Sequence, residues 1–314
     1  MKILFAFLFC GVTLQAVHAG RSIDSSWAIN IGGIRQWVNA KGKNVSDPIL
    51  LWLSGGPGAS SIGQSDKFTQ KLQEHFIVIQ WDQRETGKTV EMNKSAKPLT
   101  LSMFYNDTHD VIDSLLKYFQ KQKLYLAGYS WGTALGFYIA GKYPELLHAY
   151  IAISPMINQE ESEWMTLRML RENARTKKQK EELAAVTIPF KTGEQLYYAR
   201  KWLAVYNGNE FAKFGLNKKY VLSWADTWLP VFNEACEVKI PEVLPEIKCP
   251  VYFFAGRNDY QTQHIITEQY YNEVVAQKKN LFWFEESGHT IPDTEPLLMQ
   301  ETIINDVLSE TYTP

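Results

Sequence analysis

The chain alternates uninterrupted apolar runs with amphipathic helical patterns over most of its length, and this alternation limits the fold more than any other feature. A strand that is apolar throughout must be covered on both faces, and a helix between two strands lets them run parallel. The sequence therefore predicts an α/β fold with a mostly parallel sheet and helices on both faces. The predicted buried strands lie within residues 48–56, 76–83, 123–130, 148–155, 250–259 and 280–287.

The alternation stops between residues 157 and 246, where charged and aromatic helical patterns follow one another without a buried strand. We expect a helical cap there, inserted into a core formed by residues 20–156 and 247–314. An insertion that leaves and re-enters one sheet lies over the carboxyl ends of its strands, where open α/β sheets bind ligands. The cap is therefore expected to act as a lid. Its basic run at residues 175–182 is interpreted as a solvated helix face.

Residues 1–19 resemble a cleavable secretory signal, with an early lysine, an apolar run and the small-residue pattern Val17-His18-Ala19. The apolar run is shorter than the roughly 20 residues that a membrane-spanning helix needs. The sequence thus predicts a secreted or periplasmic protein without stable membrane insertion. A formal net charge of −2 gives no electrostatic reason to expect nucleic acid as a partner.

Loss of that segment would leave two of the three cysteines, Cys236 and Cys249. An oxidising compartment permits them to pair, and we expect a disulfide in preference to two buried thiols. Neither has metal-ligand spacing around it, and the sequence indicates no metal or organic cofactor. It does not indicate an oligomeric state.

The pattern Gly128-Tyr129-Ser130-Trp131-Gly132 stands between a predicted buried strand and a predicted helix. A plain reading is a tight turn with Ser130 as the helix N-cap. The same context is what a nucleophile elbow requires, because a sharp strand-to-helix turn exposes the serine hydroxyl and flanking glycines avoid clashes. We therefore predict Ser130 as a nucleophile.

A serine nucleophile needs a base, and the base needs a carboxylate that orients it. In this kind of fold the chain order is serine, then acid, then histidine. Asp259 follows one resumed strand and His289 follows the next, so both are expected at the same sheet edge as Ser130. His264, Glu285 and Glu286 fit the order or the strand-end position less well.

The glycine-rich run after the predicted strand at 48–56 allows backbone amides to approach a ligand closely. The amide of Trp131 and that of Gly55 or Gly56 are expected to form an oxyanion hole. In isolation the same glycines are equally consistent with a tight turn.

Three motifs carry a family resemblance: SGGPGAS at 54–60, WDQRETGKT at 81–89 and GYSWGTALG at 128–136. The chain resembles the α/β-hydrolase superfamily and, within it, the proline iminopeptidase group of serine peptidases. It departs from the group's motifs at three positions, with Ser54 in place of His and Glu85 and Tyr129 each in place of Gly.

The resemblance implies that acidic side chains in the cap bind the free α-amine of a substrate's N-terminal residue. Glu160, Glu161 and Glu163 are candidates by location, although exposed helix charge is the alternative for each. Trp224 and Trp228 are further candidate substrate-binding residues, but the tryptophan-then-glutamate arrangement of the family is missing around them.

The leading hypothesis is a serine hydrolase that removes an N-terminal residue, such as proline, from short peptides through an acyl-enzyme. A carboxylesterase with the same triad and a small ester substrate is the second hypothesis. A non-catalytic binding protein of the same fold is the third, and the complete triad disfavours it.

Overall fold

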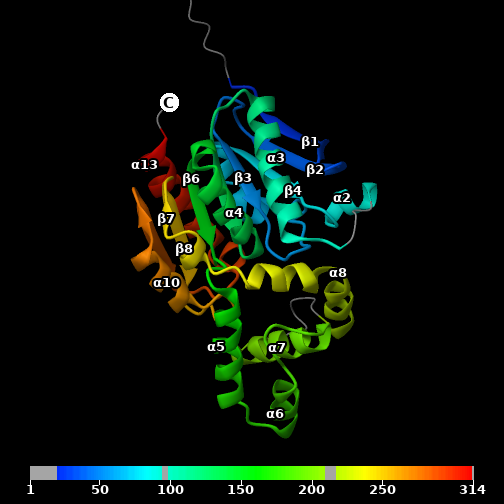
Figure 1. Cartoon of the computed structure of the whole chain (residues 1–314). Coiled ribbons are helices and arrows are strands. Elements are labelled where there is room, and N and C mark those ends of the chain that lie inside the picture. Colours follow the sequence, from blue (N-terminus) through cyan, green and yellow to red (C-terminus); the bar gives the residue numbers. More distant parts are fainter. Residues whose placement is uncertain (1–19, 94–97, 209–216, 313–314) are drawn as a thin grey trace, which may run out of the picture.

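The computed structural model describes residues 20–93, 98–208 and 217–312 of the chain. The expected signal segment, residues 1–19, lies outside these described ranges. Figure 1 shows a sheet with helices on both faces and a group of helices beyond one end of the sheet. The α/β architecture predicted from the sequence is therefore confirmed.

The main sheet has eight strands in the order β1-β2-β4-β3-β5-β6-β8-β10. The first two ladders, β1 with β2 and β2 with β4, are antiparallel, and the remaining ladders are parallel. All the parallel strands thus end at one edge. The strands are β1 (Ile23–Ile31), β2 (Ile34–Gly42), β3 (Ile49–Leu53), β4 (Ile77–Asp82), β5 (Leu124–Tyr129), β6 (Leu147–Ile153), β8 (Val251–Gly256) and β10 (Lys279–Phe284).

Successive side chains of the central strands enter two separate apolar clusters, because side chains alternate between the faces of a sheet. Leu51 and Leu126 belong to the cluster with the buried residues of α3, α4 and α10. Leu50 and Tyr125 belong to the other, with residues of α1, α12 and the π-helical turn η4. The elements are α1 (Asp66–Thr69), η1 (Leu72–Glu74), α2 (Gly87–Met92), α3 (Leu101–Phe119), α4 (Trp131–Lys142), η2 (Pro144–Leu146), α10 (His264–Glu273), α11 (Ile291–Thr294), α12 (Pro296–Thr302), η4 (Ile303–Leu308) and α13 (Ser309–Thr311).

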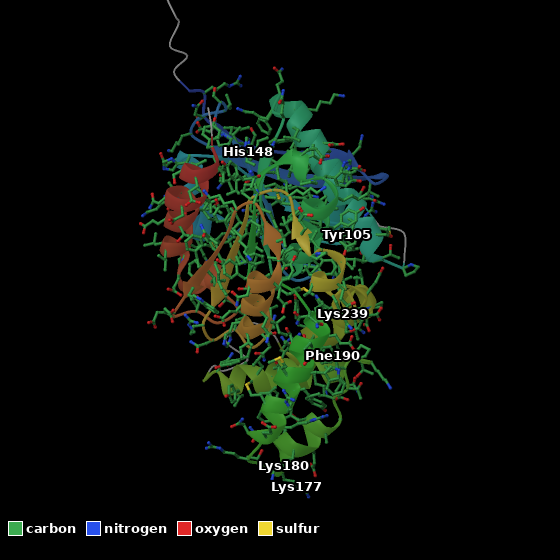
Figure 2. The ribbon with its side chains drawn as sticks, turned by 60° about the vertical axis from the view of Figure 1, so that its left-hand side comes forward. Tyr105, His148, Lys177, Lys180, Phe190 and Lys239 are labelled. Carbon is green, nitrogen blue, oxygen red and sulfur yellow. The ribbon has the colours of Figure 1, made fainter. Side chains whose placement is uncertain are left out.

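The segment between β6 and β8 supplies the helices that lie beyond the carboxyl ends of the strands (Figure 1). Lys177 and Lys180 lie at its far end, opposite His148 in Figure 2, and both lysines are exposed. A short strand, β7, ends this segment and pairs with β9 rather than with the main sheet. The elements are α5 (Gln159–Glu172), α6 (Lys177–Ala184), α7 (Gly193–Tyr206), α8 (Lys218–Cys236), α9 (Ile240–Val243), β7 (Glu246–Ile247) and β9 (Val275–Ala276). We call α5–α9 the cap.

One sequence expectation needs correction. Cys236 and Cys249 are free, buried thiols, so the expected disulfide is absent between these two described residues. Burial raises the pKa of the Cys249 thiol to about 12, which favours an uncharged apolar packing role. Of the described helices, none combines the length and apolarity needed to cross a membrane.

Candidate active site

Ser130 lies in a strained turn between β5 and α4. Its backbone angles are φ 51° and ψ −117°, a conformation that non-glycine residues rarely adopt. Glycine is required at positions 128 and 132 because neighbouring backbone atoms leave no room for a Cβ. A Cβ on Gly132 would lie 2.2 Å from the carbonyl oxygen of Leu53 on β3, and one on Gly128 would lie 2.7 Å from the carbonyl oxygen of Gly132. The turn therefore has the geometry of a nucleophile elbow.

Three loops at the carboxyl edge of the sheet bring Ser130, Asp259 and His289 together. His289 Nε2 lies 2.9 Å from Ser130 Oγ, and His289 Nδ1 lies 2.9 Å from Asp259 Oδ2. An ionised carboxylate only accepts hydrogen bonds, so Nδ1 carries the imidazole proton and Nε2 is left to accept the serine proton. This arrangement is the one that activates a serine hydroxyl.

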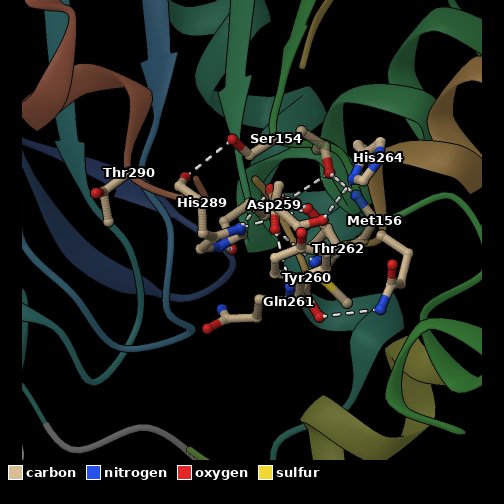
Figure 3. Close-up of polar contacts among 12 residues, drawn as sticks. Ser154, Met156, Asp259, Tyr260, Gln261, Thr262, His264, His289 and Thr290 are labelled. Carbon is tan, nitrogen blue, oxygen red and sulfur yellow. Dashed lines mark hydrogen bonds and ion pairs between the residues drawn. The ribbon is translucent and has the colours of Figure 1, made fainter. Parts of the chain in front are cut away.

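Asp259 is almost fully buried and is held by donors from the turn that follows it. Its Oδ1 accepts hydrogen bonds from the backbone amides of Gln261 and Thr262, both at 2.9 Å. The Thr262 hydroxyl donates to Oδ2 at 2.8 Å (Figure 3). Burial by itself raises the pKa of this carboxyl, but His289 and the donors of Thr262 outweigh it and hold the pKa below the ordinary value of 3.8. Asp259 therefore stays ionised.

The histidine is held from its backbone as well as its ring. Figure 3 shows the Ser154 hydroxyl, at the end of β6, donating to the carbonyl oxygen of His289 at 2.9 Å. The rival residues are engaged elsewhere. His264 Nδ1 contacts the backbone carbonyl of Asp259 rather than its carboxylate, and Glu285 forms an exposed ion pair with Arg257.

The loop after β3 passes close to the serine. A Cβ on Gly55 would lie 3.0 Å from the ring of Tyr129 and 3.3 Å from Ser130 Cβ, and Gly56 has φ 125°. Only glycines fit these positions without strain or displacement. Trp224 of the cap donates from Nε1 to the carbonyl oxygen of Pro57 at 2.8 Å, which ties this loop to α8.

Trp131 stands directly after Ser130 and begins α4, so its amide lies at a helix N-terminus. Its side chain is fully buried, and its indole N–H donates to Gln83 Oε1 at 3.1 Å. At position 54, the serine hydroxyl lies 2.8 Å from that of Ser61 and thus forms part of a hydroxyl network beneath the loop.

Ser130 and His289 open into a cavity of about 410 Å³ between the core and the cap. Gly55, Gly56 and Tyr129 line it from the core. Its cap wall is mostly apolar and aromatic, with Leu196, Tyr220, Val221, Trp224 and Phe232. Besides His289, the lining includes two charged side chains, Arg200 from α7 and Asp293 from α11. The cavity is large enough for a small organic molecule or a short peptide.

Residues 47–296 match the family model described as serine aminopeptidase, S33. The chain belongs to the serine aminopeptidase S33 family. It is also similar to a probable aminopeptidase, YbaC, of Bacillus subtilis (strain 168), at 30% identity over 306 residues, which covers 90% of this chain and 96% of the relative. The protein is therefore a serine hydrolase.

Solved structures show the α/β-hydrolase fold of this serine hydrolase. The proline iminopeptidase of Mycobacterium smegmatis has a TM-score of 0.65 and 16% identity, with 91% of this chain and 98% of that chain covered. A thermophilic esterase of Thermogutta terrifontis has a TM-score of 0.60 and 16% identity, with 92% of this chain and all of that chain covered (100%). Because an esterase and a proline iminopeptidase share the fold, the fold does not determine the substrate.

Of the cap residues expected to bind substrate, only Trp224 lines the cavity that contains Ser130. Trp228 does not; it is buried beside the loop after β3, where a Cβ on Gly58 would lie 2.5 Å from its Nε1. Glu160 and Glu161 lie at two other, smaller hollows.

Glu163 also stays outside the cavity lining, because Arg200 occupies its carboxylate. Arg200 Nη1 donates to Glu163 Oε2 at 2.8 Å and Nη2 donates to Oε1, while Gln159 Nε2 donates to Oε1 at 3.0 Å. Glu163 is thus part of a buried ion pair rather than an exposed helix charge or a cavity residue. The structure therefore brings none of these three glutamates into the cavity lining of Ser130.

Sequence reasoning missed Arg200, Asp293 and Thr262. Arg200 stands in a helix with several charged neighbours, and nothing in the sequence marks the one that faces inward. Asp293 had a usable signal, because it follows His289 by only four residues. Thr262 follows Asp259 by three residues, the spacing at which a carboxylate accepts from a following turn.

Proposed function

We propose that this serine hydrolase is an aminopeptidase that removes the N-terminal residue from short peptides through an acyl-enzyme. The observation that carries the proposal is the chain of hydrogen bonds from Ser130 through His289 to Asp259, opening into a cavity covered by the cap. Membership of the S33 family supports the aminopeptidase reaction, since the fold alone is shared with esterases.

In the first half of the reaction, Ser130 Oγ attacks the carbonyl carbon of the N-terminal residue while His289 Nε2 takes the serine proton. The resulting imidazolium is stabilised by the buried, ionised Asp259. His289 then gives the proton to the leaving amine, the C–N bond breaks, and an ester joins the residue to Ser130. Water, deprotonated by His289, releases the residue in the second half.

The oxyanion of each tetrahedral intermediate is assigned to the amides of Trp131 and of Gly55 or Gly56. Gly55 approaches Ser130 closely, and the amide of Trp131 gains from the N-terminus of α4. Removal of one such donor typically costs about 10²- to 10³-fold in kcat.

Two features favour small substrates with an apolar first residue. The cap covers the cavity, and a volume of about 410 Å³ admits a dipeptide or tripeptide rather than a folded chain. Leu196, Trp224 and Phe232 provide apolar surface against which a pyrrolidine ring or an aliphatic side chain can pack. A preference for proline is part of the proposal on this ground.

The test is hydrolysis of prolyl and alanyl 4-nitroanilides with free and with acetylated amines, with Ser130→Ala as the control. We expect turnover of the free-amine substrates that is lost in Ser130→Ala. If the enzyme instead cleaves simple esters in a Ser130-dependent way and no amides, the aminopeptidase proposal is wrong and a carboxylesterase replaces it.

A further inference from the structure

The α-amine of an N-terminal residue is two bonds from the carbonyl carbon that Ser130 attacks. A group that recognises this amine must therefore line the same cavity as Ser130. At neutral pH the amine is largely protonated, so a carboxylate is the natural partner. Among the described residues that line the cavity, Asp293 is the one aspartate or glutamate.

Resting on the proposed aminopeptidase activity, we propose that Asp293 binds the α-ammonium group of the substrate. This places amine recognition on the core, in the segment that carries His289, rather than on the cap glutamates expected from the sequence.

The position of Asp293 is fixed by the short helix α11, which follows His289 directly. Ile291 is fully buried in the core cluster beneath it, and the amide of Asp293 donates to the carbonyl oxygen of Thr290 at 2.9 Å. The backbone of Asp293 is therefore held at a constant place relative to His289. Partial burial raises the pKa of the Asp293 carboxyl, and the positive charge of Lys67 offsets this rise only in part.

The other charged side chains around the cavity have partners other than Asp293, and Lys67, whose charge lowers the pKa of Asp293, does not line the cavity. Arg200 is neutralised by Glu163, and Asp259 is engaged by His289 and its own turn. Within the described part of the chain, no hydrogen bond or ion pair engages the carboxylate of Asp293. A cavity wall with one unpaired carboxylate favours a cationic ligand over an anionic one.

The alternative is that Asp293 is an ordinary solvent-facing residue at the cavity mouth, since the residue is exposed. The two readings differ in what they predict for uncharged ligands. An amine-binding residue affects only ligands with a free amine, whereas a surface residue affects none.

The experiment compares Asp293→Asn with the wild type in two assays. The first measures kcat/KM for free-amine alanyl 4-nitroanilide and for 4-nitrophenyl acetate. The second measures inhibition of 4-nitrophenyl acetate hydrolysis by prolinamide and by N-acetylprolinamide. Asp226→Asn is the matched control, because Asp226 is exposed on α8 and does not line the cavity.

We expect Asp293→Asn to lose about 10- to 100-fold in kcat/KM for the free-amine substrate, mainly through KM, as for one lost charge-assisted hydrogen bond. Inhibition by prolinamide should weaken by a similar factor. Ester turnover, inhibition by N-acetylprolinamide and all properties of Asp226→Asn should stay within about twofold. Asp293→Glu should recover part of the loss.

The inference is overturned if Asp293→Asn leaves prolinamide inhibition unchanged, or if it lowers ester and free-amine turnover equally. The inhibition assay separates this inference from the proposed function. If the wild type cleaves no peptide but prefers prolinamide over its acetylated form through Asp293, the reaction is misassigned while the amine site stands.

Discussion

The ion pair between Glu163 and Arg200 gives a test of whether Glu163 acts in folding or in substrate recognition. The two side chains are 3% and 14% exposed, and the guanidinium makes a bidentate contact with the carboxylate. Glu163→Gln removes the negative charge and leaves Arg200 buried without its counter-charge. Such a loss costs about 3–5 kcal/mol of the free energy of unfolding.

For a domain of this size, 1 kcal/mol corresponds to about 2–4 °C in Tm, so Glu163→Gln should melt about 6–20 °C below the wild type. The double variant Glu163→Gln, Arg200→Met removes the buried charge that was left unpaired. It should recover most of the loss, because replacing a whole buried ion pair is often close to neutral.

Thermal melts and urea titrations of the wild type, both single variants and the double variant supply the double-mutant cycle. Glu194→Gln is a control, since its ion pair with Lys218 is nearly half exposed on both sides and should contribute less than about 1 kcal/mol. The reasoning is refuted if Glu163→Gln keeps the wild-type Tm and selectively loses free-amine substrates. Glu163 would then be an amine ligand after all.

Three further predictions follow from the site. Gly132→Ala places a Cβ 2.2 Å from the Leu53 carbonyl oxygen, so we expect a lower Tm and a loss of esterase activity. The control is Gly63→Ala, which has open space around the new Cβ and should change neither the Tm nor the activity. Trp224→Phe removes the hydrogen bond to Pro57 and should lower kcat about fivefold in steady-state assays at an unchanged Tm; an unchanged kcat would show that this contact does not position the loop. The folded-state pKa of Asp259 lies below 3.8, so its ionised form adds stability that is present above that pH and lost as the pH falls through the folded-state pKa. Melts between about pH 6 and 2 should therefore show a shallower acid decline for Asp259→Asn, and an equal decline in both proteins would contradict the assigned pKa.

Much of the core was predictable because its signals are local. Buried strands such as β3 and β8 are apolar throughout, and a parallel sheet then places the loops after β5, β8 and β10 at one edge. That edge is where Ser130, Asp259 and His289 were expected and where the structure places them within hydrogen-bond distance. Their catalytic roles are part of the proposed function, which Ser130→Ala tests.

The cap and the cysteines show where local signals fail. Glu160, Glu161 and Glu163 have similar sequence surroundings, yet one is buried against Arg200 and the other two face separate hollows. Helix rotation decides between these outcomes, and a rotation depends on partners distant in the chain. Cys236 and Cys249 likewise can pair only if folding brings them together, and they are free.

The sequence by itself determined the order of strands and helices, the strained turn at Ser130 and the chain order of the triad, because glycines, apolar runs and short motifs act on their own neighbours. Tertiary structure alone decided which charges meet. Arg200 lies 37 residues from the glutamate that neutralises it, and Asp293 lies in the core cavity wall with its carboxylate unpaired within the described chain. The strength of an electrostatic interaction depends on the distance between the charges and on their burial, and both are set only in the folded structure.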